Sequence, residues 1–390
     1  MAAKKTLNVG MIGYKFMGKT HSNAYRQVAR FFDLPVEPVM KVICGRDKAG
    51  VTDAAKKLGW QEVETDWRKV IARPDIDIID ISTGNETHAE IAIAAAQAGK
   101  HIFCEKPIAL NVAEAKQMVA AAQKAKVINM VNFNYRGVPA VVLAKQLIND
   151  GRIGQIYHWR GAYLQDWIMD PNFPLVWRLD KKLAGSGALG DIGAHNIDLA
   201  RYLVGEITEL VADMKTFIEK RPKATATGGL SAKGGKDMGR VTVDDATSML
   251  LRFANGAMGV VEATRFAGGR KNDNIFELYG SKGSLRWRFE DMNNLEFLDL
   301  TAPPALQGFN KILVTDGSVH PYFGAWWPGG HIIGYEHTFV HNIYEFLVGI
   351  AKKKNPQPDF YDAMRTQMVL EAVEESAKER KWVKIPAPRK

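Results

Sequence analysis

Gly10-Met11-Ile12-Gly13-Tyr14-Lys15-Phe16-Met17-Gly18 is the stretch that decides the predicted fold. It joins an apolar run at residues 7–12 to a helical pattern that starts at Phe16, which is the setting of a dinucleotide-binding glycine loop. Gly13 permits the tight turn, and Gly18 permits the helix to pack closely on the strand. The N-terminus of that helix would offer N–H groups and partial positive charge to a pyrophosphate.

Lys15 departs from the usual loop, because it stands where the second glycine of the fingerprint is expected. Its β-carbon should hinder close approach of the backbone to the pyrophosphate, and its ammonium group can compensate by contacting a phosphate. We expect the loop to contact the coenzyme through Gly13, Tyr14, Lys15, Phe16 and Met17.

Strands and helices alternate outward from this loop through the first third of the chain. Apolar runs predict strands at 7–12, 39–44, 76–81, 101–104 and 127–132, and periodic patterns predict helices at 16–30, 48–58, 88–98 and 112–125. Right-handed β-α-β units at this spacing build a parallel sheet covered on both faces. We therefore expect a doubly wound, Rossmann-type dinucleotide-binding domain at residues 1–134.

The alternation of predicted strands and helices ends after residue 134, and several of the later strands follow one another without a helix between them. We expect helices at 139–149, 191–204, 336–350 and 362–380, and strands at 156–164, 208–217, 246–253, 258–264, 275–279 and 284–289. Asn255-Gly256 is a strong hairpin signal, and the Gly- and Lys-rich residues 220–239 are expected to form a surface loop. Residues 135–390 thus predict an α+β domain with a large, mostly antiparallel sheet, which would bind substrate and form a homodimer or homotetramer.

Composition sets further limits on this chain of 390 residues. No apolar run approaches the about 20 residues of a membrane helix, and the N-terminus lacks the apolar core of a signal peptide. Cys44 and Cys104 lie in apolar segments and predict buried free thiols, which suits the cytoplasm. The net charge of +9 is spread along the chain without an aromatic-basic signature, so we expect no nucleic-acid partner.

The second strand ends in Gly45-Arg46-Asp47, which bears on coenzyme choice. An acid at this place would bind the ribose 2′-hydroxyl of NAD, whereas an arginine suits the 2′-phosphate of NADP. Arg46 therefore favours NADP over NAD, and Asp47 can be read as a helix N-cap.

Polar residues follow the next strands at the carboxyl edge of the sheet, where such folds bind ligands. We expect coenzyme contacts from Ser82, Thr83, Asn85, His88, Glu105 and Lys106, although a turn with a helix cap also explains residues 82–88. A lysine at position 106 can hold an alcohol oxygen and stabilise the developing alkoxide.

Asp191 and His195 are spaced to share one helical face behind the glycine-rich residues 184–190. Histidine can accept a proton near neutral pH, and a carboxylate can orient it or bind a substrate hydroxyl. Asp191 as a plain helix N-cap is the alternative. No His/Cys cluster has metal-ligand spacing, so no metal is expected.

Four motifs follow one another along the chain: the glycine loop, Thr83-Gly-Asn85-x-x-His88, Glu105-Lys106-Pro107 and Asp191-x-x-x-His195. Their order and spacing resemble the Gfo/Idh/MocA oxidoreductase family over essentially the whole chain. The resemblance is to the levoglucosan dehydrogenase branch in Phe16-Met-Gly-Lys-x-His-Ser22, Phe133-Asn-Tyr-Arg-x-x-Pro-Ala140, Tyr163-Leu-Gln-Asp-Trp167 and Ala184-Gly-Ser-Gly-Ala-Leu-Gly-Asp191. The family usually has Thr-Pro-Asn where Thr83-Gly84-Asn85 stands, and a glycine at Lys15.

This resemblance implies an NAD(P)-dependent dehydrogenase that oxidises a ring hydroxyl of a sugar, anhydrosugar, glycoside or cyclitol. Lys106, Asp191 and His195 would be catalytic, with His195 as proton acceptor. Substrate contacts would come from Arg136, Tyr163, Gln165, Asp166, Arg178, Asp191 and His195. The alternatives are a glycosidase that uses bound NAD(P) for transient oxidation, and a non-catalytic nucleotide-binding regulator.

Overall fold

The computed structural model describes residues 4–225, 232–318, 320 and 322–388. Its contacts divide the chain into two compact units, Met1–Val138 with Pro321–Met364, and Pro139–His320 with Arg365–Lys390. The expected division at residue 134 did not include the return of residues 321–364 to the first unit.

The first unit contains a six-stranded parallel sheet in the order β3-β2-β1-β4-β5-β6. Its central strands are apolar and buried because helices cover a doubly wound sheet on both faces. The strands are β1 (Lys5–Ile12), β2 (Val36–Cys44), β3 (Glu62–Glu64), β4 (Ile78–Ile81), β5 (His101–Glu105) and β6 (Asn129–Asn132), and the helices are α1 (Phe16–Phe31), α2 (Lys48–Leu58), α3 (Trp67–Ala72), α4 (His88–Gln97) and α5 (Val112–Ala125). The predicted Rossmann architecture is confirmed.

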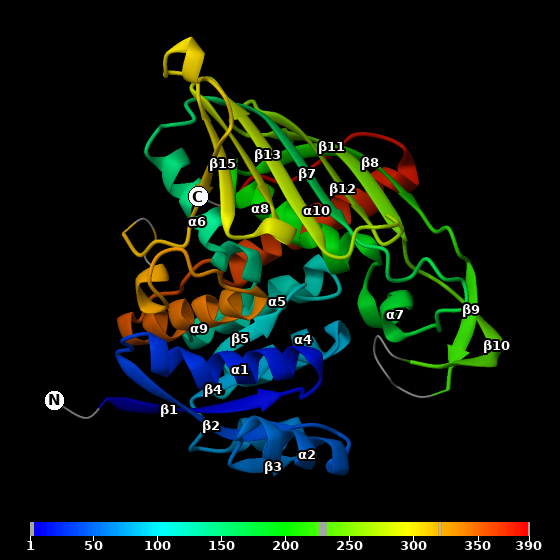
Figure 1. Cartoon of the computed structure of the whole chain (residues 1–390). Helices are drawn as coiled ribbons and strands as arrows, with labels where there is room; N and C mark the ends of the chain where they lie inside the picture. The colour runs from blue at the N-terminus through cyan, green and yellow to red at the C-terminus, as the bar shows by residue number, and fades with distance from the viewer. Residues whose placement is uncertain (1–3, 226–231, 319, 321, 389–390) are drawn as a thin grey trace. The chain divides into compact units, whose positions relative to one another are not determined.

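Helix α9 (Tyr335–Lys352) explains why the chain returns to the first unit. It runs beside α1 in Figure 1, and its Phe339 and Phe346 are buried in the same apolar cluster as Phe103. The side chain of Asn342 also donates to Asn132 Oδ1 at 2.9 Å. Part of this core is therefore supplied from far along the chain.

The second unit is built on a nine-stranded sheet in the order β16-β15-β14-β13-β7-β12-β11-β8-β17. Strands β7 and β12 pair in parallel, and the remaining neighbours pair antiparallel, as predicted. The strands are β7 (Ile156–Leu164), β8 (Ile207–Lys215), β11 (Ala246–Phe253), β12 (Met258–Thr264), β13 (Asp273–Gly280), β14 (Gly283–Arg288), β15 (Asn294–Asp299), β16 (Asn310–Leu313) and β17 (Val383–Lys384).

Helices cover one face of this sheet, and the other face is open. Strand β11 alternates between buried and exposed side chains, which is the pattern of a sheet packed on one side. The unit's helices are α6 (Pro139–Asn149), α7 (Lys181–Ala184), α8 (Ala194–Leu203) and most of α10 (Phe360–Glu379). The Asn255-Gly256 hairpin between β11 and β12 is confirmed, with Gly256 at φ +87°.

The expectation of a loop at residues 220–239 is wrong for the described part. Strands β9 (Lys220–Ala224) and β10 (Gly234–Arg240) pair antiparallel, while residues 226–231 lie outside the described residues. Arg221 is fully buried and donates to the carbonyl oxygens of Ile168 and Asp170. That anchor holds the hairpin despite its loop-like composition.

Both cysteines, Cys44 and Cys104, are free and buried, as predicted. Among the described residues, no helix combines the length and apolar character needed to cross a membrane.

Candidate active site

The glycine loop between β1 and α1 has the shape that a dinucleotide requires. Gly13 has φ +110°, and a β-carbon there would lie 2.5 Å from the Ser82 carbonyl oxygen. A β-carbon on Gly18 would lie 2.2 Å from the Gly13 carbonyl oxygen, so both positions need glycine. Helix α1 begins at Phe16 with no acidic residue in its first turn, and Lys15 beside it is exposed. This helix end therefore fits an anionic pyrophosphate.

The end of β2 lies against Tyr14 of the same loop. A β-carbon on Gly45 would lie 2.3 Å from the Tyr14 ring, so the aromatic ring covers this glycine. Burial, followed by the charge of Asp47, raises the pKa of Tyr14. Asp47 Oδ1 accepts from the Ala49 N–H at 3.1 Å, which confirms the N-cap interpretation, and Arg46 is exposed.

The residues after β4 differ in their access to a ligand. Thr83 and Asn85 are partly exposed, and the Thr83 hydroxyl lies 2.6 Å from that of Thr87. His88 is fully buried, and its Nδ1 lies 2.9 Å from the Pro107 carbonyl oxygen. Burial lowers the pKa of His88, so a neutral ring donates to that carbonyl. His88 is thus bonded to the segment after Lys106, and its direct contact with the coenzyme stays a prediction.

Glu105 and Lys106 lie at the carboxyl end of β5, as the sequence predicted. The Glu105 side chain is buried, and its Oε2 accepts from the Lys106 backbone N–H at 3.2 Å. Ser82 is likewise buried and donates to Asp80 Oδ1 at 2.8 Å. Both side chains thus have hydrogen-bond partners inside the first unit, and their contact with the coenzyme stays a prediction.

In the second unit, a buried carboxylate holds the glycine-rich segment that precedes Asp191. Asp244 accepts from the backbone N–H groups of Gly187 at 2.6 Å and Leu189 at 2.7 Å. A β-carbon on Gly187 would lie 1.8 Å from the Asp244 carbonyl oxygen, so only glycine fits. Residues Leu189–Gly193 form a π-helical turn ahead of α8, a distortion that often marks functional sites.

Arginine side chains fix the Asp191 carboxylate. Asp191 Oδ2 lies 3.0 Å from Arg265 Nη2 and 4.0 Å from Arg178 Nε. Arg265 is fully buried, and its Nε and Nη1 have no hydrogen-bond partner among the described residues. Burial lowers the pKa of Arg178, and the charge of Asp191 opposes that shift. Two guanidinium groups thus face the Asp191 carboxylate.

His195 lies in the first turn of α8, beside a polar and aromatic group on the sheet. Its ring centroid is 5.9 Å from that of Tyr163. The Tyr163 hydroxyl and Gln165 Nε2 each donate to Asn272 Oδ1 at 2.7 Å. Trp167 Nε1 donates to Gln165 Oε1 at 2.8 Å, which adds a flat apolar face of the kind that sugar sites use.

Two predicted substrate residues have partners inside their own unit. Arg136, in the first unit, is buried and pairs with Asp362 Oδ2 at 2.7 Å. Asp166 accepts from Lys271 Nζ at 2.7 Å and from the Gly269 N–H at 3.1 Å. A substrate that binds to Arg136 or Asp166 would therefore have to share these side chains with their ion-pair partners.

Asp244, Arg265 and Asn272 were not predicted from the sequence. They belong to segments far from Asp191 and Tyr163 along the chain, and no local motif surrounds them. Within the described ranges, no group of His, Cys, Asp and Glu side chains is arranged to hold a metal ion.

Comparison with known proteins gives two family matches. Residues 7–133 match the model described as the oxidoreductase family, NAD-binding Rossmann fold, and residues 141–286 match the GFO/IDH/MocA C-terminal domain.

One similar sequence and two similar structures cover nearly the whole chain. Levoglucosan dehydrogenase of Pseudarthrobacter phenanthrenivorans is 44% identical over 389 residues, covering 98% of this chain and 99% of that protein. A structure of levoglucosan dehydrogenase in complex with NADH and levoglucosan superposes with a TM-score of 0.93 at 44% identity, covering 98% of this chain and 100% of the other. An oxidoreductase domain protein from Kribbella flavida gives a TM-score of 0.94 at 52% identity, with 98% and 100% covered.

Proposed function

The chain belongs to the Gfo/Idh/MocA oxidoreductase family and is an NAD(P)-dependent dehydrogenase acting on CH–OH groups, and we propose that its substrate is an anhydrosugar or a closely related pyranose. The observation that carries the proposal is the likeness to levoglucosan dehydrogenase over 98% of the chain. The group of Tyr163, Gln165 and Trp167 supports it, because it offers aromatic and amide surfaces for a sugar ring.

We assign the chemistry to Lys106, Asp191 and His195. A bound nicotinamide would supply the acceptor for the hydride that leaves the carbinol carbon. His195 takes the hydroxyl proton as general base, and Lys106 holds the oxygen as negative charge develops on it. Asp191, paired with Arg265, remains an acceptor for a substrate hydroxyl.

A substrate panel tests this proposal. Levoglucosan, D-glucose, myo-inositol and a methyl glucoside are assayed with NAD⁺ and NADP⁺ by absorbance of the reduced nicotinamide. We expect the highest kcat/KM for levoglucosan, because Tyr163, Gln165 and Trp167 lie in a stretch that resembles the levoglucosan dehydrogenase branch. Preference for the cyclitol would contradict the substrate assignment. Release of methanol from the glucoside without net reduction of coenzyme would instead indicate the glycosidase.

Coenzyme preference rests on Arg46, and we propose NADP over NAD. Arg46→Ala should raise the KM for NADP⁺ about tenfold or more, because a charge-assisted contact with the 2′-phosphate is lost. The KM for NAD⁺ should change less than about twofold, since NAD lacks that phosphate. Steady-state kinetics with both coenzymes checks this, with the exposed neighbour Lys48→Ala as control. The 44% identical relative was solved in complex with NADH, and an equal effect of Arg46→Ala on both coenzymes would refute the proposed preference for NADP.

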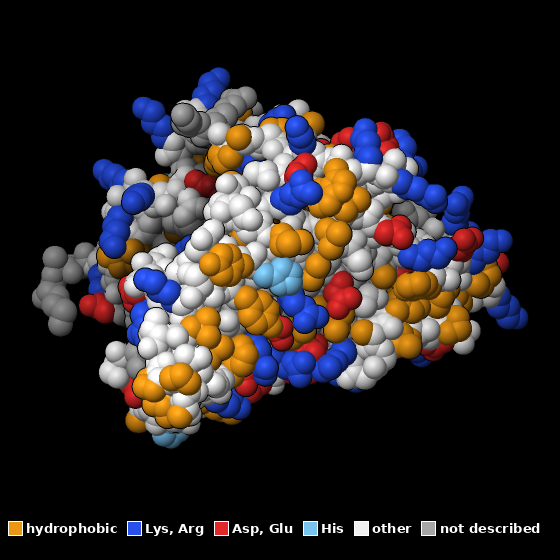
Figure 2. Space-filling view, turned by 90° about the horizontal axis from the view of Figure 1, so that it is seen from above, with side chains coloured by type: hydrophobic (Ala, Val, Ile, Leu, Met, Phe, Trp, Pro, Cys, Tyr) orange, Lys and Arg blue, Asp and Glu red, His pale blue; other side chains and the backbone are white. Residues whose placement is uncertain are grey.

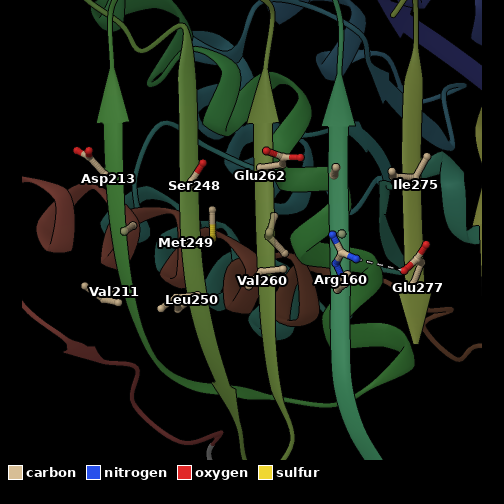
Figure 3. A pocket seen from close by; sticks show the side chains of 14 residues that line it. Arg160, Val211, Asp213, Ser248, Met249, Leu250, Val260, Glu262, Ile275 and Glu277 are labelled. Carbon is tan, nitrogen blue, oxygen red and sulfur yellow. Dashed lines mark ion pairs between the residues drawn. The ribbon is translucent and has the colours of Figure 1, made fainter. Parts of the chain in front are cut away.

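The open face of the nine-stranded sheet supports a homo-oligomer. It carries a hollow of about 520 Å³ lined by Val211, Leu250, Val260 and other side chains, beside the Arg160–Glu277 ion pair at 3.7 Å (Figure 3). Tyr157, Leu250 and Met258 are 52%, 44% and 55% exposed. Hydrophobic and charged side chains are interleaved on the molecular surface seen in Figure 2. A face with apolar area and both signs of charge can pair with a second copy of itself.

Disrupting this face should lower the oligomeric state. Leu250→Glu combined with Met258→Glu places like charges at the proposed interface, so a dimer or tetramer should become a monomer. Size-exclusion chromatography with light scattering measures the mass, and Leu306→Glu, an exposed position between β15 and β16, is the control. A wild-type protein that is already monomeric would refute the interface.

We also infer a cytoplasmic location. The buried free thiols of Cys44 and Cys104 suit a reducing compartment.

A further inference from the structure

A buried charged network in the first unit joins the helix of the glycine loop to the end of β5. His21 of α1 is fully buried. Its Nδ1 lies 2.8 Å from Asp80 Oδ1 on β4, and its Nε2 lies 2.8 Å from Glu105 Oε1 on β5. The Asp80 and Glu105 side chains are buried as well, so water does not screen these contacts.

The geometry fits a His21 ring whose two nitrogens both carry protons. Ionised carboxylates only accept hydrogen bonds, and only the imidazolium form has two N–H donors. Burial alone would lower the pKa of His21, but Asp80 and Glu105 outweigh it and raise the pKa to about 10. Burial would raise the pKa of Glu105, and the bond from His21 outweighs that effect and lowers it.

The Glu105 carboxylate links His21 to the backbone of Lys106. Its Oε1 accepts from His21 and from Asn132 Nδ2 at 2.6 Å, which fixes one side of the carboxylate. Its Oε2 accepts from the Lys106 backbone N–H at 3.2 Å. Asn132 is held in turn by Asn342 of α9 at 2.9 Å. The backbone that carries Lys106 is therefore tied to α1, β6 and α9 through one carboxylate.

We propose that His21 is a positioning residue for the oxidation, holding Glu105 so that Lys106 keeps a fixed place relative to the glycine loop. The inference rests on the proposed catalytic role of Lys106. A cluster of buried charges is a costly way to stabilise a core, since apolar residues of similar volume often serve as well. We infer that this cluster serves to fix positions, because it joins α1, which follows the glycine loop, to the end of β5, which Lys106 follows.

The test separates position from stability by kinetics on folded protein. His21→Gln leaves one amide N–H₂ group between two carboxylates, so we expect kcat to fall roughly 100-fold, as small misplacements do. Substrate KM and coenzyme Kd should change less than about threefold, because neither binding surface is removed. His101→Gln is the matched control, because His101 lies at the other end of β5 and accepts from the Ile128 N–H. Assays are run well below each variant's Tm.

Two further variants keep the test decisive if His21→Gln does not fold. His21→Gln with Asp80→Asn removes one positive and one negative charge, and leaves the amide to donate to Glu105, so kcat should recover to within about fivefold of wild type. Glu105→Ala should lose kcat as His21→Gln does, with coenzyme Kd preserved. A lowered Tm with unchanged kcat in His21→Gln, or unchanged kcat in Glu105→Ala, overturns the proposal. If Lys106→Ala is itself active, the assigned function fails first, and the two failures remain distinguishable.

Discussion

Replacing Lys106 with alanine is expected to lower kcat roughly 100- to 1,000-fold, the loss seen when one donor to a developing oxyanion is removed. Lys106 directly follows β5 at the carboxyl edge of the parallel sheet, where this fold binds its ligands. The backbone N–H of Lys106 stays bonded to Glu105 in the variant, so the strand end should keep its conformation.

Coenzyme binding serves as the internal check on that result. Fluorescence titration of the reduced coenzyme should give a Kd within about threefold of wild type, because the glycine loop is untouched. Lys124→Ala, in the last turn of α5, provides a lysine control outside the site. Near-normal turnover by Lys106→Ala would sink the catalytic assignment, and loss of coenzyme binding would make this residue a binding residue instead.

Replacing His195 with alanine is expected to lower kcat by about 100- to 10,000-fold, the usual range for a general base. His195 has the position for that role, because it lies in the first turn of α8 beside Tyr163 and follows the π-helical turn that carries Asp191. Added imidazole should restore part of the rate, since it can replace the missing base in the cavity left by the side chain.

A histidine of similar setting provides the comparison. His158 on β7 stacks on Tyr279, and His158→Ala should retain wild-type kcat. If His195→Ala keeps its rate, or loses it without any response to imidazole and with a lowered Tm, a structural role would replace the catalytic one.

Much of the fold is predictable where local signals bound an element. Helix α2 (Lys48–Leu58) matches its predicted limits because Asp47 caps its start and Gly59, in a left-handed conformation, ends it. Strands β11 and β12 match because the Asn255-Gly256 turn fixes their register. Strand β3, with 3 residues, was missed because it is too short to show a periodicity.

The residues of the proposed site could be named from the sequence only where they follow a motif. Lys106, Asp191 and His195 stand in such motifs, whereas Arg265 reaches Asp191 from the end of a distant strand. Arg136 and His88 show a different limit, because a sequence does not reveal that a polar side chain has a buried partner in the folded chain. Those partners appear only when segments distant in sequence pack together.

The return of α9 to the first unit bears on how the protein is made. A ribosome releases the glycine loop and all strands of the parallel sheet long before it reaches Tyr335. Until then, the apolar surfaces of α1 and β5 that pack against Phe339 and Phe346 remain exposed to solvent. Asn132 also has no hydrogen bond from Asn342 during that time. The nascent chain therefore contains an incomplete first unit through most of synthesis. During that period its exposed apolar surface can bind chaperones or aggregate.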